Sequence, residues 1–250
     1  WNEVTELAKS VTRFDDGVQY RGLEANVPER MASQLSLPFV DPETNQSILS
    51  TEPWTKIFRQ MADIYAIPGN EEVAFKGDGQ TMFTKDRRLA MFAELNIITA
   101  EDMASDPDFW DMASYPVFPE APLRETGPDL HVLLISSVSE HKDDAFRVIS
   151  AVVSDEVQVD MARYGKLNIM ADSSLKAAFA ENLDYMADKN IQGVFQNMPA
   201  EPYPATLYDR EAITILTQEF KQVVAGDKDV NTALRDADER LNQAIAALKE

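Results

Sequence analysis

The side chains with the widest chemical repertoire are scarce in this sequence. It holds two histidines, His131 and His141, and no cysteine. The histidines are not four residues apart, the spacing that would place two metal ligands on one helix face. A zinc site would therefore need carboxylates to complete it. We predict no metal site and no cofactor, and the absence of cysteine excludes disulfides and thiolate ligands.

One acidic stretch begins like a calcium-binding loop. Asp227, Asp229 and Asn231 have the right spacing for its first ligands. The sixth position, which needs glycine for a sharp turn, is Thr232, and the twelfth is Asp238 rather than glutamate. We expect these residues to cap the last helix instead, because their side-chain oxygens can accept from its free backbone N–H groups.

Motifs for covalent catalysis are missing. The sequence has no G-x-S-x-G turn for a serine nucleophile and no glycine-rich loop of the kind that holds phosphates. We therefore predict no catalytic residue. A pair of carboxylates for glycoside hydrolysis remains an open alternative, since 43 acidic residues supply many candidate pairs.

A binding surface is the remaining possibility. Aromatic rings stack on the apolar face of a sugar, while Asp, Glu, Asn and Arg bind its hydroxyl groups. Three stretches combine these residue types: AELN (93–96), WDMASYP (110–116) and PAEPYPATLY (199–208). Each aromatic residue taken singly fits core packing better than ligand contact. Together the three stretches favour a carbohydrate site.

Composition excludes some partners. With 44% hydrophobic and 26% charged residues, the 250-residue chain is long enough for one large or two smaller domains. It carries 43 acidic against 23 basic residues, a formal charge of -20. Such a surface repels polyanions, so nucleic acid is not expected as a partner. No apolar run is long enough to span a bilayer.

Local patterns predict alternating helices and strands, and hence an α/β class with a helical C-terminal part. We expect a first helix through Val4, Leu7, Ala8 and Val11, and further helices at 28–35, 52–65, after Ser139, after Ser154 and after Thr232, with a helical stripe on 54–65 in the core. We expect strands at VQYRGL (18–23), LAMF (89–92), HVLLISS (131–137), and from 109 into the proline-rich segment YPVFPE.

In the order of its motifs the chain resembles the extracellular solute-binding proteins of sugar-type ABC transporters, the family of maltose-binding protein. WNEVTELAKSVT, DGVQYRGL and RRLAMF are similar to its helix and the two strands that follow. YPVFPE resembles the proline connector between its lobes. The longest similarity is SSVSEHKDDAFRVISAVVSDEVQVDMARYG, and ALRDADERLNQAI resembles the closing helix.

The resemblance implies a periplasmic-binding-protein type II fold, with two α/β lobes and the ligand held between them. It begins partway into the family pattern, so we expect that the chain lacks the N-terminal segment and that the first lobe is incomplete. Residues 1–118 would form the second lobe, residues 119–174 would be the segment returned to the first lobe, and residues 175–250 would be a helical part packing back on the second.

The resemblance also assigns candidate ligand residues. Strand 89–92 would end at the cleft, because open α/β sheets bind ligands beyond the carboxyl ends of their strands. A plain turn is an equally good interpretation of its two polar residues. Where many members have a stacking aromatic, this chain has Ile97, which weakens that contact. The predicted ligand-binding residues are Glu94, Asn96, Tyr115, Tyr203, Tyr208 and Glu29.

The function implied is capture of a sugar or oligosaccharide outside the cell and its delivery to ABC transporter permease subunits, without catalysis. Family members are extracellular lipoproteins or periplasmic, so we expect membrane attachment only through an upstream lipid anchor. Two alternatives stay open: a glycoside hydrolase or other carbohydrate-active enzyme, which turnover of glycosides would reveal, and a purely structural or interaction module, which would bind no sugar at all.

Overall fold

The computed structural model describes residues 1–25, 27–71, 78–94, 97–127, 131–167 and 173–248. The chain divides into two compact units, each built from separate stretches of sequence. Unit 1 comprises residues 1–95, 115–128 and 197–250, and unit 2 comprises residues 96–114 and 129–196. The predicted lobe boundaries at residues 118 and 174 stay predictions.

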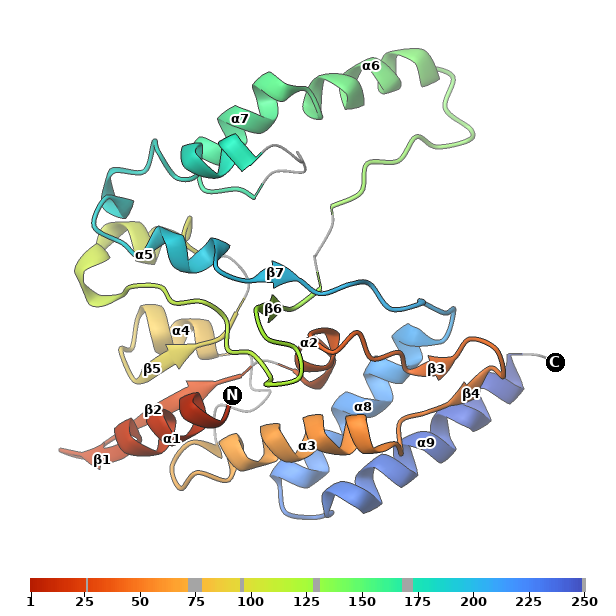
Figure 1. Cartoon of the computed structure of the whole chain (residues 1–250). Helices are drawn as coiled ribbons and strands as arrows, with labels where there is room; N and C mark the ends of the chain where they lie inside the picture. The colour runs from red at the N-terminus through yellow and green to blue at the C-terminus, as the bar shows by residue number, and fades with distance from the viewer. Residues whose placement is uncertain (26, 72–77, 95–96, 128–130, 168–172, 249–250) are drawn as a thin grey trace. The chain divides into compact units, whose positions relative to one another are not determined.

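Unit 1 contains all the strands of the described chain and most of its long helices (Figure 1). Its elements are α1 (Asn2–Val11), β1 (Arg13–Asp15), β2 (Val18–Glu24), α2 (Pro28–Ser33), β3 (Val40–Asp41), β4 (Gln46–Ser47), α3 (Glu52–Tyr65), α4 (Gly79–Thr84), β5 (Leu89–Phe92), β6 (Arg124–Glu125), β7 (Met198–Pro199), α8 (Asp209–Val224) and α9 (Val230–Ala247).

A three-stranded sheet in the order β1-β2-β5 organises unit 1. β1 and β2 form an antiparallel hairpin, turned by Asp16 and Gly17 with φ of 47° and 80°, the positive values that tight hairpins need. β2 and β5 are parallel, with Glu24 paired to Phe92. The strands predicted at 18–23 and 89–92 are confirmed. Because the pair is parallel, both strands end at one edge of the sheet.

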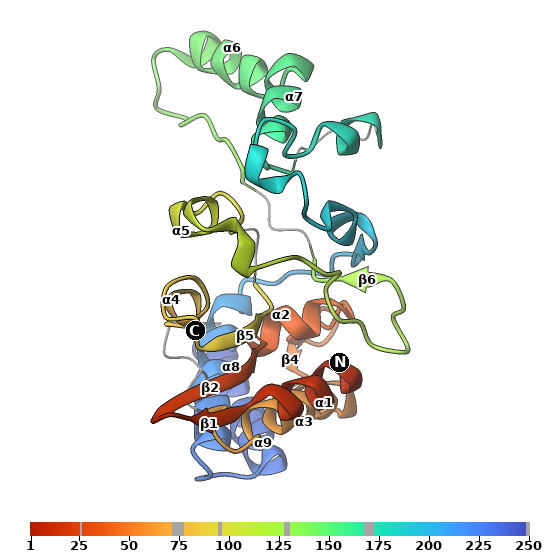
Figure 2. The same ribbon diagram turned by 90° about the vertical axis from the view of Figure 1, so that its left-hand side faces the viewer.

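The core of unit 1 lies among α1, α3, α8 and α9. The stripe on α3 predicted to be buried is confirmed, and Trp54 and Phe58 are fully enclosed. α3 contacts both α1 and α9, and α8 packs along α9 (Figures 1 and 2). The predicted cap of α9 is also confirmed: the Asp229 carboxylate accepts from the backbone N–H groups of Asn231 and Thr232.

Asn70 ties the end of β2 to the end of α3. It is completely buried. Its Oδ1 accepts from the N–H groups of Gly22 (2.9 Å) and Leu23 (3.2 Å). Its Nδ2 donates to the carbonyls of Leu23 (2.9 Å) and Ile64 (3.1 Å). One side chain thus satisfies four buried backbone groups, and it holds the half of β2 that ends at the sheet's carboxyl edge.

Unit 2 is helical in its described part. Its elements are α5 (Glu101–Ser105), η2 (Pro107–Phe109), α6 (Lys142–Val152), α7 (Asp155–Arg163), η3 (Ser173–Ala178), η4 (Asp184–Met186) and η5 (Ile191–Phe195). The predicted helices after Ser139 and Ser154 are confirmed as α6 and α7, and Gly165, with φ of 77°, closes α7. Lys189 holds the 107–110 segment by donating to the carbonyls of Pro107 and Trp110.

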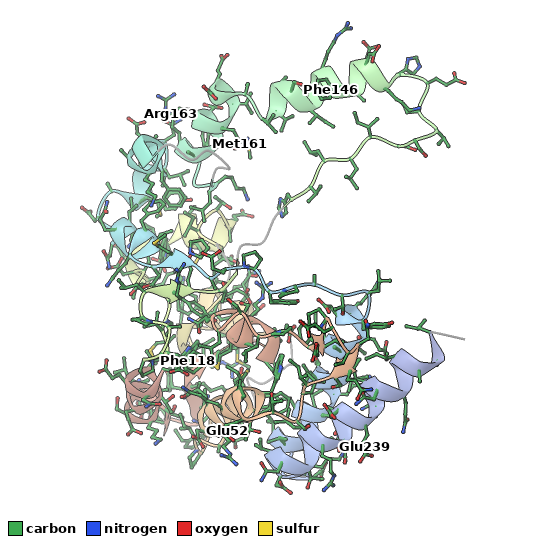
Figure 3. All side chains as sticks on the ribbon, turned by 45° about the vertical axis from the view of Figure 1, so that its right-hand side comes forward. Glu52, Phe118, Phe146, Met161, Arg163 and Glu239 are labelled. Carbon is green, nitrogen blue, oxygen red and sulfur yellow. The ribbon has the colours of Figure 1, made fainter. Side chains whose placement is uncertain are left out.

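Two predicted strands of this region are wrong. Residues 131–137 form no strand and are mostly exposed, with Leu134 at 85%. Phe109 ends the short helix η2, and residues 110–112 follow it without forming a strand. An isolated strand leaves its backbone donors and acceptors unpaired, and the described part of unit 2 offers neither segment a partner strand. Apolar side chains of α6 are exposed too, among them Phe146 at 64% (Figure 3).

None of the described helices is long and apolar enough to cross a membrane.

Candidate ligand-binding site

Carboxylates gather at the carboxyl edge of the parallel pair β2 and β5. Glu24 is the last residue of β2, and Glu94 follows β5 by two residues. Asp78 is the N-cap residue of α4. The Glu24 carboxylate lies directly against Gly79, where a Cβ atom would collide with it. Glycine at 79 therefore allows the carboxylate to sit there. We call Glu24, Asp78 and Glu94 the carboxylate cluster.

Burial and mutual repulsion set the charge of this cluster. Burial is the main reason that the pKa of Glu24 rises from 4.5 to about 7, and the negative charges of Glu94 and Asp78 raise it further. The Oε2 atom of Glu24 and the Oδ1 atom of Asp78 are buried, and no described residue forms a hydrogen bond with either. Buried acceptors without partners are uncommon in proteins. The cluster therefore has unused capacity to accept hydrogen bonds.

Two tyrosines lie beside the cluster. The Tyr65 hydroxyl accepts from the backbone N–H of Ala25 (3.3 Å), and burial followed by the charge of Glu24 raises its pKa. Burial also raises the pKa of Tyr115, where Arg30 acts in the opposite direction and Glu94 adds to the rise. The Tyr115 hydroxyl is enclosed and has no hydrogen-bond partner within the described ranges.

The position of Tyr115 is fixed from several sides. Its ring packs edge-on against Trp1, with 5.4 Å between ring centroids, and its carbonyl accepts from Nδ2 of Asn197 (2.8 Å). The Gln34 amide donates to the carbonyls of Pro116 (2.7 Å) and Arg124 (2.9 Å), which ties the same segment to the end of α2. The ring is thus structural, and the hydroxyl is the part of the side chain without a described hydrogen-bond partner.

Glu29 and Tyr203 supply a further buried acceptor and a further tyrosine in unit 1. Glu29, in the first turn of α2, has a buried Oε2 without a partner in the described chain, and burial raises its pKa. Burial raises the pKa of Tyr203 to about 12, with further increases from Asp209 and Glu29. The Tyr203 ring packs edge-on against Phe39 at 5.6 Å.

Four of the six predicted ligand residues form two pairs in which the carboxylate lies near enough to raise the pKa of the tyrosine: Glu94 with Tyr115, and Glu29 with Tyr203. Tyr208 is half-buried against the core at the start of α8, where its backbone N–H donates to Thr206 Oγ1. Asn96 lies outside the described residues. The ligand roles of all six stay predictions.

Sequence reasoning missed Glu24, Asp78 and Tyr65. Glu24 could have been found from the sequence. It ends the strand next to β5, and open α/β sheets bind ligands beyond the carboxyl ends of their strands. Asp78 and Tyr65 had no such signal. Asp78 precedes a six-residue helix, and Tyr65 belongs to the apolar stripe of α3. Only the tertiary structure shows that both lie near Glu24.

An open groove of about 700 Å³ lies elsewhere in unit 1, and its lining includes neither the carboxylate cluster nor Tyr65 and Tyr115. Its charged lining includes Lys56 and Glu120, which already form an ion pair with each other. The carboxylate cluster differs because no described residue bonds to the buried oxygens of Glu24 and Asp78. Within the described ranges, no three His, Asp or Glu residues are grouped closely enough to hold a metal ion.

Replacing Glu24 with Gln should change how stability depends on pH. The folded-state pKa of Glu24 is raised, so the folded state keeps its proton after the unfolded state has lost it. Wild-type stability should therefore fall, relative to the variant, as pH rises from 4.5 through about 7. After allowance for partial solvent screening, we expect the variant to be more stable by about 1–2 kcal/mol at alkaline pH.

Urea titrations of both proteins across this pH range measure the difference. The two should be equally stable at pH values below 4.5, where the Glu24 carboxyl is protonated in both the folded and the unfolded state. Glu239→Gln, at an exposed position of α9, provides a control with the same change in charge. A stability difference that does not vary with pH would show that Glu24 is ionised normally.

Comparison with solved structures identifies the fold, although no protein-family model and no curated protein sequence matches the chain. A putative oligosaccharide periplasmic-binding protein from Synechococcus is 18% identical with a TM-score of 0.69, over 99% of this chain and 66% of that one. The maltose/maltodextrin-binding domain of Bdellovibrio bacteriovorus, bound to maltotriose, is 17% identical with a TM-score of 0.64, over 98% and 66%.

An ABC substrate-binding protein of Listeria monocytogenes, in complex with cycloalternan, has a TM-score of 0.69 and 15% identity, over 98% of this chain and 63% of that one. The chain therefore spans just under two thirds of the length of these structures. Over that extent it has the α/β periplasmic-binding-protein type II fold, and the predicted fold class is confirmed. These similar structures are binding proteins rather than enzymes.

Proposed function

We propose that this protein, which shares the fold of sugar-binding solute-binding proteins over most of its own length, captures a sugar or oligosaccharide outside the cell and delivers it to an ABC transporter permease. The fold alone does not assign a ligand, because one fold supports many functions. The proposal is carried by the site: buried oxygens of Glu24 and Asp78, to which no described residue bonds, lie at the carboxyl edge of a parallel strand pair, and the Tyr115 hydroxyl, likewise without a partner among the described residues, lies near Glu94.

A carbohydrate fits this site because its hydroxyl groups are hydrogen-bond donors. Glu24, Asp78 and Glu29 each present a buried oxygen that a sugar hydroxyl can satisfy. The Tyr115 hydroxyl can both donate and accept. The site contains no described serine or cysteine nucleophile beside a histidine, so its residues suit binding better than covalent catalysis.

The binding test uses the protein at its full natural length and a panel of neutral saccharides that includes maltotriose, tagatose and cycloalternan. Thermal shift identifies a ligand, and titration calorimetry gives its affinity. Tyr115→Phe should weaken binding about threefold to tenfold, because it removes one ligand hydrogen bond, without lowering the melting temperature. Tyr164→Phe, at an exposed position of unit 2, should leave affinity unchanged.

Several results would contradict the proposal. Loss of stability without loss of affinity in Tyr115→Phe would make the hydroxyl a structural group. No thermal shift with any saccharide would favour a structural module. A glycoside hydrolase remains the competing function for one specific reason: a carboxyl group with a pKa of about 7 beside a second carboxylate suits general acid catalysis. Glycoside turnover that Glu24→Gln abolishes would establish the enzyme instead.

A further inference from the structure

Tyr115 lies in a stretch of chain that has no regular secondary structure to hold it. Residues 111–117 form neither helix nor strand. Tyr115 is also the first residue of unit 1 after the chain returns from unit 2, and Asn197 begins the last stretch of unit 1 in the same way. Because no helix or sheet fixes the backbone here, the position of the Tyr115 ring depends on side chains that bond to this stretch.

Gln34 supplies two of these restraints from the end of α2. It is buried, with only 2% of its surface exposed. Its Oε1 accepts from the indole N–H of Trp1 (2.7 Å), and the Trp1 ring packs edge-on against Tyr115. Its Nε2 donates to the carbonyl of Pro116, the residue that follows Tyr115, and to that of Arg124. Gln34 thus restrains Tyr115 through a neighbour in space and through its neighbour in sequence.

The three bonds of Gln34 require an amide at this position. An indole N–H can only donate a hydrogen bond and a backbone carbonyl can only accept one, so a single side chain must do both to serve all three partners. Glutamate could keep the bond to Trp1, but when ionised it could not donate to either carbonyl. Alanine would lose every bond.

Asn197 restrains Tyr115 directly. It is 8% exposed, and its Nδ2 donates to the Tyr115 carbonyl (2.8 Å). The Tyr115 hydroxyl is enclosed, and no described residue bonds to it. The described contacts therefore hold the ring and the backbone of Tyr115, and none of them uses its hydroxyl.

We infer that Gln34 and Asn197 are positioning residues for sugar binding, which hold the Tyr115 hydroxyl where a saccharide can bond to it. Both act through Tyr115, and neither contacts the saccharide. This inference rests on the proposed function and adds the residues on which affinity depends indirectly. A hydrogen bond forms only within a narrow range of distances and angles, and ordering a mobile ring on binding costs free energy. A ring held in place beforehand avoids that cost.

The test is a double-variant cycle on the full-length protein. The probe is whichever of maltotriose, tagatose and cycloalternan gives the wild-type protein the largest thermal shift, titrated calorimetrically well below the melting temperature of each variant. Gln34→Ala should weaken its binding about threefold to tenfold, the loss expected for Tyr115→Phe. In the Tyr115→Phe background, Gln34→Ala should weaken binding by no more than about twofold further, because the bond that it positions is already lost.

Controls separate positioning from loss of stability. Gln34→Ala removes a donor from two carbonyls, so its melting temperature should fall as well. Gln158→Ala removes another buried glutamine, in α7 of unit 2, whose Nε2 donates to the Val152 carbonyl (3.0 Å). It should lower the melting temperature and leave affinity unchanged. Asn197→Ala tests the second restraint on Tyr115 independently, even if Gln34→Ala does not fold, and should weaken binding about threefold.

The outcomes separate this inference from the proposed function. Unchanged affinity in Gln34→Ala and in Asn197→Ala would overturn the positioning role and leave sugar capture standing. Losses that multiply in the double variant would also overturn it, because Gln34 would then affect binding by a route other than Tyr115. Failure of the wild-type protein to bind any of the three saccharides would overturn the proposed function, and the positioning role with it.

Discussion

Asn70→Ala is expected to lower the free energy of unfolding by about 3–5 kcal/mol. The N–H groups of Gly22 and Leu23 and the carbonyl of Leu23 would lose the Asn70 amide as their partner inside the core, whereas the Ile64 carbonyl also accepts from the N–H of Ile67 (3.4 Å). Each buried group left unpaired costs about 1–3 kcal/mol, and water entering the space left by the side chain would recover part of the sum. Urea unfolding at neutral pH measures the loss.

Asn70→Asp tests the same contacts by charge. Aspartate can still accept from the N–H groups of Gly22 and Leu23, but when ionised it cannot donate to the carbonyls of Leu23 and Ile64. Burial would raise its pKa, so this variant should regain stability as pH falls and the carboxyl takes up a proton. Asn2→Ala, at an exposed position of α1, should change stability by less than about 0.5 kcal/mol.

The consequence of losing Asn70 should extend to the candidate binding site. The residue holds the second half of β2, and Glu24 is the last residue of that strand. A loosened β2 would let the Glu24 carboxylate move from its place against Gly79. We therefore expect Asn70→Ala to bind ligand more weakly even where it remains folded. Stability within 1 kcal/mol of wild type would show that water replaces the amide fully.

Trp54→Ala should cost a similar amount, about 3–5 kcal/mol, by a different mechanism. Trp54 is completely buried in α3, and its removal leaves a cavity that the surrounding helices cannot fill. Its ring lies 5.2 Å from that of Phe39, and its Nε1 donates to the Pro38 carbonyl (3.0 Å). Thermal and urea unfolding both report the loss.

The conservative variant Trp54→Phe separates packing from hydrogen bonding. It keeps an aromatic ring and loses the bond to Pro38, so we expect a loss of about 1–2 kcal/mol. Leu7→Ala, at a position 51% exposed, is the matched control and should change stability by no more than about 0.5 kcal/mol. A loss below 2 kcal/mol in Trp54→Ala would mean that the core closes around the missing ring.

Trp54 also supports a predicted ligand residue through Phe39. The Phe39 ring contacts Trp54 on one side and Tyr203 on another. Loss of Trp54 frees Phe39 to move, and Tyr203 then loses the surface that holds its ring. Ligand affinity of Trp54→Ala should fall with stability, whereas Trp54→Phe should retain most of it.

The sequence by itself determined the elements whose signals are local. The apolar stripe of α3 repeats at helical spacing, Asp229 and its neighbours predict the cap of α9, and the residue pattern at 89–92 predicts β5. Each signal depends on residues a few positions apart, so neighbours in sequence suffice to reveal it. The order of these elements also carried the resemblance from which the fold class was predicted.

Only the tertiary structure decided which residues share the site. Glu24 and Glu94 are 70 positions apart, and the parallel register of β2 and β5 places both at one edge. The Asn70 side chain bonds to backbone groups of Gly22 and Leu23 in β2, and no local sequence pattern predicts this contact. The strand predicted at residues 131–137 is absent for a related reason. Their apolar pattern predicts a strand, but a strand forms only when another chain segment pairs with it. Pairing is a long-range property, and local sequence does not encode its partner.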